Sequence, residues 1–145
     1  MKKIIVINGP NLNNLGNRSP KHYGKLTLDK IIYLMRKHSE NTNIKFLFYQ
    51  SNHEGRIIDF IQKKVKEASG IIINPGALTH YGYSLKDALI DTNLPIVEVH
   101  LSEIKNREKF RKLDIFEDIV ISVISGLKED GYLKAIDLLI SYLNK

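Results

Sequence analysis

The stretch that decides the fold class is Lys3-Ile4-Ile5-Val6-Ile7-Asn8-Gly9-Pro10, at the start of the chain. Its four consecutive apolar residues are typical of a β-strand that is buried on both faces. The Asn-Gly-Pro sequence then ends the apolar run, which is shorter than the roughly 7–15 residues of a secretory signal core. Similar runs rich in Ile and Val predict further strands at residues 44–49, 71–73, 96–99 and 119–123.

Helical patterns separate these predicted strands. The first has apolar residues at positions 28, 31, 32 and 35, with Thr27 as N-cap, and the second has them at 57, 58, 61, 65 and 68, with Gly70 where a helix would end. A third helix is predicted around residues 85–89 and a fourth from about 131 to 143. Alternating strands and helices predict a parallel sheet covered on both faces. Five strands favour an α/β flavodoxin-like doubly wound sheet, formed by a single domain over residues 1–145.

The composition is that of a soluble globular protein. The chain has 145 residues, 43% of them apolar and 26% charged, and its 22 basic against 16 acidic residues leave a net charge of +6. The basic excess suits either nucleic acid or a small anionic substrate. Its densest part, Lys63-Lys64-Val65-Lys66, lies on a predicted amphipathic helix and is interpreted as a solvated face.

The sequence lacks cysteine and long apolar runs, and both absences narrow the class of protein. The chain contains no Cys, which excludes disulfides, a thiol nucleophile and Cys-ligated metal sites and suits a cytoplasmic protein. No apolar run approaches the roughly 18 residues of a membrane-spanning helix, so no membrane partner is expected.

Residues 9–26 show neither helical nor strand periodicity. Connections of this length in compact domains are usually lids or binding loops, so this segment is predicted to be a lid over the functional site.

Polar side chains follow four of the predicted strands. In an open parallel α/β sheet, ligands bind beyond the carboxyl ends of the strands. Three of the five histidines, His53, His80 and His100, fall at such ends. Turn chemistry alone explains Asn, Gly and Pro at these places but not this coincidence. We therefore expect a site at this edge of the sheet.

Several chemistries are disfavoured by missing motifs. Neither GxGxxG nor GxxxxGK[ST] occurs, which argues against a nucleotide site. The metal-binding spacings HxxxH and HExxH are absent, as is the GxSxG elbow of Ser hydrolases. What remains is acid–base chemistry on an anionic, oxygen-rich small molecule, whose carboxylate Arg18, Arg107 or Arg111 can hold.

Four blocks of sequence carry a family resemblance. They are Asn8-Gly9-Pro10-Asn11-Leu12-Asn13 with Gly16, Arg18, Pro20, Tyr23-Gly24 and Thr27-Leu28; Gln50-Ser51-Asn52-His53-Glu54-Gly55; Asn74-Pro75-Gly76-Ala77 with Thr79-His80, Leu85 and Asp87-Ala88; and Glu98-Val99-His100-Leu101-Ser102 with Arg107-Glu108 and Phe110-Arg111. In order and spacing, over nearly the whole chain, they resemble the type II 3-dehydroquinate dehydratases.

The resemblance implies a reaction and a set of catalytic residues. The reaction is the reversible anti elimination of water from 3-dehydroquinate to give 3-dehydroshikimate, through an enolate-type intermediate in the shikimate pathway. Tyr23 is implied to be the general base, with Arg18 stabilising the tyrosinate and the intermediate. His100 is implied to be the general acid, with Glu98 behind it, and Asn11 to place a water on the enolate.

The resemblance also implies how substrate is held and how subunits assemble. The substrate's hydroxyl groups and carboxylate are implied to be held by Asn74, His80, Leu101, Ser102 and Arg111. Asp87 is implied to reach the site of a neighbouring subunit within trimers that form a homododecamer. No metal, Schiff base or organic cofactor is implied.

Elementary chemistry agrees with the role of Tyr23. A free Tyr has a pKa near 10, so it acts as a base at neutral pH only beside positive charge. Arg18 lies five residues before Tyr23, and Arg107 is a second candidate for that cation.

Some positions depart from the family pattern without falling on an implied catalytic residue. They are Asn14, Leu78, Gly82, Lys86, Glu103 and Asp114, where an apolar residue, an aromatic residue, Ser, Arg, Asn and Ser are expected. Two functions of other classes remain open at this point: a non-catalytic module that binds a small anion or nucleotide, and a basic RNA-associated domain. The scattered Lys residues and the absence of Trp argue against the second.

Overall fold

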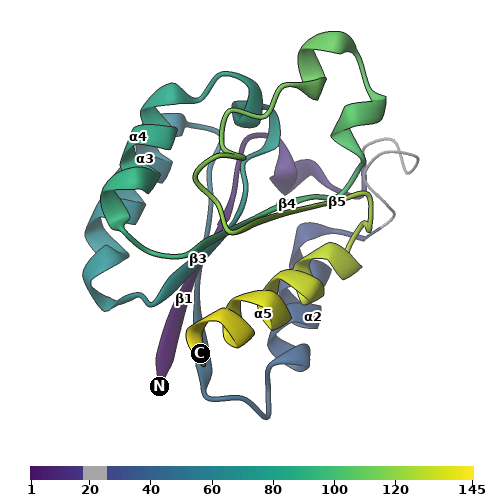
Figure 1. Ribbon diagram of the computed structural model, residues 1–145. Coiled ribbons are helices and arrows are strands. Elements are labelled where there is room, and N and C mark those ends of the chain that lie inside the picture. The colour runs from purple at the N-terminus through teal and green to yellow at the C-terminus, as the bar shows by residue number, and fades with distance from the viewer. Residues whose placement is uncertain (18–25) are drawn as a thin grey trace.

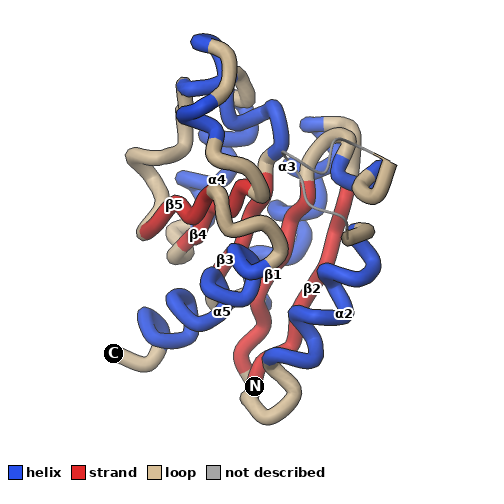
Figure 2. Tube along the Cα trace, turned by 90° about the vertical axis from the view of Figure 1, so that its right-hand side faces the viewer, coloured by secondary structure: helices blue, strands red, loops and turns tan. Residues whose placement is uncertain are grey.

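The computed structural model describes residues 1–17 and 26–145. Its centre is a five-stranded parallel sheet in the order β2-β1-β3-β4-β5, which is the flavodoxin-like order and confirms the predicted fold class. The strands are β1 (Lys2–Asn8), β2 (Ile44–Gln50), β3 (Gly70–Asn74), β4 (Ile96–His100) and β5 (Ser122–Ser125). All five are seen in this order in Figure 2.

Two pairs of helices cover the two faces of the sheet (Figure 1). Helices α2 (Leu28–His38) and α5 (Asp130–Leu143) lie on one face, and α3 (Glu54–Lys64) and α4 (Tyr83–Thr92) on the other. The side chains of β1 alternate between these layers. Ile4 and Val6 join the core under α2 and α5, whereas Ile5 and Ile7 join the core under α3 and α4. All four are fully buried, which explains the continuous apolar run.

Helix α2 begins where the sequence predicts. Thr27 has extended backbone angles, and its side-chain oxygen accepts a hydrogen bond from the backbone N–H of Lys30 at 3.3 Å. This is the N-cap bond that was expected of Thr27.

Two predicted boundaries are wrong. Helix α3 ends at Lys64, a short 3₁₀ turn (Val65–Glu67) follows, and Gly70 is the first residue of β3 rather than the end of a helix. A Cβ atom at Gly70 would lie 3.0 Å from Cδ2 of Leu139 in α5, so close packing of α5 on the sheet accounts for this glycine.

The fifth strand begins at Ser122, three residues later than predicted. Ile119 and Val120 are apolar because they pack on the core under α3 and α4, not because they pair in the sheet. The backbone N–H of Ile119 bonds to the carbonyl of Phe116 in a turn, and the chain reaches β4 only where Ile121 N–H bonds to the carbonyl of Ile96 at 2.8 Å.

The predicted lid, residues 9–26, is described in part. It contains a short 3₁₀ turn (Leu12–Asn14) whose Leu12 is buried in the core. Residues 18–25 lie outside the described residues, so the lid function stays a prediction. No helix within residues 1–17 and 26–145 is long and apolar enough to cross a membrane.

The backbone segments that follow β1 and β3 are in direct contact. Gly9 N–H donates to the carbonyl of Asn74 at 2.8 Å, and a Cβ atom at Gly9 would lie 2.4 Å from the carbonyl oxygen of Pro75. This contact leaves no room for a side chain at the edge of the sheet where the pocket opens.

We expect Gly9→Ala to lower the free energy of unfolding by about 1–3 kcal/mol, because the added methyl group collides with backbone that cannot swing away. Gly55→Ala is the matched control, since a Cβ at Gly55 in the first turn of α3 meets nothing within 4 Å. That variant is expected to be neutral or stabilised by up to about 1 kcal/mol. Urea unfolding followed by circular dichroism compares the two, and equal midpoints would contradict the account.

Candidate active site

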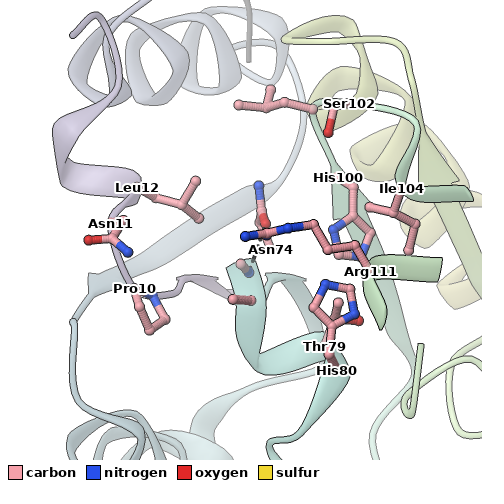
Figure 3. Close-up of a pocket in the computed structure, with 13 residues that line it drawn as sticks. Pro10, Asn11, Leu12, Asn74, Thr79, His80, His100, Ser102, Ile104 and Arg111 are labelled. Atoms are coloured by element: carbon pink, nitrogen blue, oxygen red, sulfur yellow. Dashed lines mark hydrogen bonds between the residues drawn. The ribbon is translucent and has the colours of Figure 1, made fainter. Parts of the chain in front are cut away.

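A cavity of about 110 Å³ lies beyond the carboxyl ends of β1, β3 and β4 (Figure 3). It brings together most of the predicted site residues, namely Asn11, Asn74, His80, His100, Leu101, Ser102 and Arg111. They come from four separate segments of the sequence. Thr79 and Ile104 also line the cavity, although no site role was predicted for either.

The remaining predicted residues lie elsewhere. Glu98 is fully buried beneath His100, and Asp87 is exposed on α4 and does not line the cavity. His53, counted with the strand-end histidines, is exposed at the N-cap of α3 and also does not line it. Arg18 and Tyr23 fall outside the described residues.

His100 and Glu98 form the buried half of the site. Because they lie two residues apart on β4, their side chains project from the same face of the strand. His100 Nε2 contacts Glu98 Oε2, which leaves Nδ1 as the other ring nitrogen. Burial lowers the pKa of His100, and the carboxylates of Asp114 and Glu103 oppose that shift. Burial raises the pKa of Glu98.

A third carboxyl group adjoins this pair. Thr79 Oγ1 lies 2.8 Å from Glu98 Oε2 and 2.9 Å from Asp114 Oδ1, and the backbone N–H of Phe116 donates to the same Asp114 oxygen at 2.8 Å. Asp114 is only 7% exposed. Sequence analysis gave Asp114 no site role, because its partner Thr79 lies 35 residues away, and noted only that the position departs from the family pattern.

Glu98, His100 and Asp114 form the one group of potential metal ligands found among the described residues, with their ligand atoms within 4.8 Å of one another. Their facing atoms are, however, already bonded within the network: His100 to Glu98, and both carboxyl groups to Thr79. This favours a proton-linked cluster over a metal centre.

Asn74, at the end of β3, is held from two sides. Its Nδ2 donates to the hydroxyl of Tyr132 at 2.9 Å, and its Oδ1 accepts from the backbone N–H of Gly76 at 3.1 Å. The Tyr132 hydroxyl in turn donates to Asn8 Oδ1 at 2.6 Å. Tyr132 is fully buried in the core, and its hydroxyl connects the ends of β1 and β3 to α5. Burial raises the pKa of Tyr132 far above its usual value, so the hydroxyl stays protonated.

Arg111 supplies positive charge to the pocket. It is half-buried, its Nε lies 2.9 Å from Glu108 Oε2, and its guanidinium lies 4.9 Å from the centre of the Phe110 ring. His80 Nδ1 contacts the carbonyl oxygen of Leu113 at 2.6 Å, and this contact orients the His80 ring. Figure 3 shows both side chains at the same pocket as His100 and Asn74. A cation, amides and an imidazole around one small cavity suit a hydroxylated carboxylate.

We expect Tyr132→Phe to lower the free energy of unfolding by about 1–3 kcal/mol, because it leaves buried polar atoms of Asn8 and Asn74 without a partner. Tyr33→Phe is the control, since Tyr33 is exposed on α2 and should leave stability unchanged. Thermal or urea unfolding measures both variants. A Tyr132→Phe protein as stable as the control variant would show that the network contributes nothing.

The fold and the pocket together define an α/β enzyme class with an acid–base site for a small polar molecule. The sequence pattern of the family Dehydroquinase class II matches residues 2–140. A 3-dehydroquinate dehydratase from Halothermothrix orenii is 46% identical over 145 residues, which cover 100% of this chain and 98% of the relative. One from Roseiflexus castenholzii is 49% identical over 138 residues, 95% of this chain and 88% of the relative.

A solved structure gives the same result. The crystal structure of a type II dehydroquinase from Butyrivibrio crossotus superposes with a TM-score of 0.92 at 42% identity, covering 99% of this chain and 98% of that one. The chain belongs to the class II dehydroquinase family, which confirms the resemblance drawn from its four sequence blocks.

Proposed function

We propose that this protein is a 3-dehydroquinate dehydratase, a hydro-lyase that reversibly removes water from 3-dehydroquinate to give 3-dehydroshikimate in the shikimate pathway. The observation that carries the proposal is His100, which lines the same cavity as Asn74 and Arg111 and is backed by the buried carboxyl of Glu98. Family membership and the names of the relatives support it.

In the proposed mechanism, a base removes a proton from the carbon next to the ketone and an enolate-type intermediate forms. His100 then protonates the departing hydroxyl group, which leaves as water. Glu98 supports this role, because a buried carboxylate on Nε2 favours the protonated ring and leaves Nδ1 as its other proton donor. Asn11 is proposed to place a water on the enolate oxygen.

Substrate binding is assigned to the polar lining of the cavity. Arg111 is proposed to hold the substrate carboxylate, and the hydroxyl groups are assigned to Asn74, His80, Leu101 and Ser102. The hydrogen bonds that hold Asn74 and His80 support this assignment, because a pre-oriented side chain loses less freedom when substrate binds. No metal or organic cofactor enters the proposed reaction.

Tyr23 is proposed as the base and Arg18 as the cation that lowers its pKa, with Arg107 as the second candidate for that cation. These two roles rest on the family resemblance and on the chemistry of phenols, since residues 18–25 are not among the described residues. Without a neighbouring positive charge, a phenol with a pKa near 10 would be almost fully protonated at neutral pH.

We expect Tyr23→Phe to lower kcat by about 10²–10⁴-fold, because it removes the oxygen that takes the proton and keeps the ring. Tyr33→Phe again serves as the control and should retain wild-type activity. The assay follows the ultraviolet absorbance of the conjugated enone formed from 3-dehydroquinate. If the Tyr23 variant kept more than about a tenth of the activity, the base would have to be another group.

Assembly is part of the proposal: trimers in which Asp87 of one subunit reaches the neighbouring site, arranged as a homododecamer. The exposed position of Asp87 on α4, away from its own cavity, supports a role across a subunit boundary. Exposed apolar side chains near the pocket mouth, Tyr81, Phe110 and Leu113, suit a covered surface. A cytoplasmic location is proposed as well, in keeping with the absence of cysteine.

Light scattering combined with dilution kinetics tests the assembly. We expect a dodecamer whose specific activity falls as it dissociates, because each site would lose the residue supplied by its neighbour. A fully active monomer would refute the role assigned to Asp87.

A further inference from the structure

The hydroxyl of Thr79 makes more hydrogen bonds to carboxyl groups than it has protons. Its oxygen lies 2.8 Å from Glu98 Oε2 and 2.9 Å from Asp114 Oδ1, both at hydrogen-bonding distance. A threonine hydroxyl carries one proton and can therefore donate to only one of them. The other contact requires a proton on a carboxyl group, or it would place two unprotonated oxygens against each other.

The burial of the two carboxyl groups points the same way. Glu98 Oε1 and Asp114 Oδ2 are both buried and have no hydrogen-bond partner among the described residues. Because two buried negative charges side by side are costly, one carboxyl group of the pair is favoured to stay protonated.

The surroundings place that proton on Asp114. Glu98 Oε2 already faces both His100 Nε2 and Thr79 Oγ1, and as a carboxylate it accepts from both. Thr79 then has an unused lone pair toward Asp114, which is where an Asp114 proton is needed. Burial and the adjacent Glu98 carboxyl raise the pKa of Asp114 to about 6, and they outweigh the hydrogen bonds from Phe116 N–H and Thr79, which lower it.

We propose that Asp114 is a positioning residue for the acid His100: its carboxyl group holds a proton that orients Thr79 toward Glu98, and it releases that proton as the pH rises. This inference rests on the proposed role of His100 as general acid. It gives Asp114 two effects, a structural one while it is protonated and an electrostatic one once it is ionised.

The electrostatic effect has a definite sign. When Asp114 loses its proton, the cluster behind His100 gains a second negative charge, which raises the pKa of His100 and keeps its ring protonated to higher pH. Glu103 acts on His100 in the same direction, and Glu117 adds negative charge near Glu98. Arg111 and His80, the cationic or titratable side chains across the cavity, act in the opposite direction when charged. Asp114 contacts Thr79 directly, and its pKa is raised to about 6.

Position 114 departs from the family pattern, and the arrangement shows how Asp and the expected Ser differ there in chemistry. The Ser expected there from the family resemblance has a hydroxyl that can donate to Thr79 or Glu98 but cannot ionise in this range. Asp at the same place supplies the donor at low pH and the charge at high pH.

Infrared spectroscopy of the substrate-free protein tests for the proton. At about pH 5.5, exposed Asp and Glu are ionised, so a C=O stretch of protonated carboxyl should report a buried group. We expect this band in the wild type and in the control Glu117→Gln, whose side chain is exposed and outside the hydrogen-bonded chain, and we expect its loss in Asp114→Asn. Absence of the band from the wild type would overturn the proposal, whatever the enzyme's activity.

The pH profile of kcat tests the effect on His100. Asp114→Asn keeps a hydrogen-bond donor of the same shape but cannot ionise. It should lose less than about tenfold in kcat at its optimum, well below the loss expected if the acid itself were removed. Its alkaline limb should move to lower pH by about one unit, and that of Glu117→Gln should move much less, because Glu117 is exposed to solvent and its charge is screened.

Asp114→Ser provides a second neutral donor in case the Asn variant folds poorly, and it should show the same shift. An alkaline limb unchanged in a folded Asn or Ser variant would contradict the proposal. Failure of the wild type to dehydrate 3-dehydroquinate would instead contradict the proposed function and leave the infrared result to stand by itself.

Discussion

The contact between Glu98 and His100 at the end of β4 is the interaction on which the rest of the site depends. A buried carboxyl group is tolerated only when hydrogen bonds compensate for lost hydration. Glu98 has such contacts with His100 and with Thr79, which lies on the turn after β3. The position of the imidazole is therefore fixed by two neighbouring strands and by the segment that carries Asp114, not by a loop alone.

A second buried network holds Asn74, another residue that lines the cavity. Tyr132 of α5 joins Asn8 at the end of β1 to Asn74 at the end of β3, and Gly9 lets these strand exits meet through their backbones. Asn74 of this network lines the same cavity as His100 and Thr79, and Arg111 supplies the charge there for an anionic ligand. Part of the basic charge is compensated locally, since Lys64 pairs with Glu67 and Lys86 with Asp118.

Much of this could be predicted from sequence because the signals are local. The run from Ile4 to Ile7 marks a doubly buried strand, Thr27 caps the helix that follows it, and polar residues after each strand predict where the pocket forms. The errors arise where long-range packing decides. Gly70 resembles a helix terminus but serves close packing against Leu139, and Ile119 resembles a strand residue but packs beneath a turn.

Asp114 and Tyr132 show the same limit within the site. The partners of each residue lie far away in sequence, 35 residues from Asp114 to Thr79 and 124 from Tyr132 to Asn8. Whether a polar side chain is buried, and what it meets there, depends on contacts that a single sequence does not reveal.

The measurement that tests the central claim most directly is the turnover of 3-dehydroquinate by the wild type and by His100→Gln, followed through the enone absorbance with no metal added. Gln preserves a polar side chain of similar reach but cannot serve as the acid. The account predicts enone formation by the wild type and a kcat lower by about 10²–10⁴-fold in the variant. A folded His100→Gln protein that turned over substrate at the wild-type rate would contradict it.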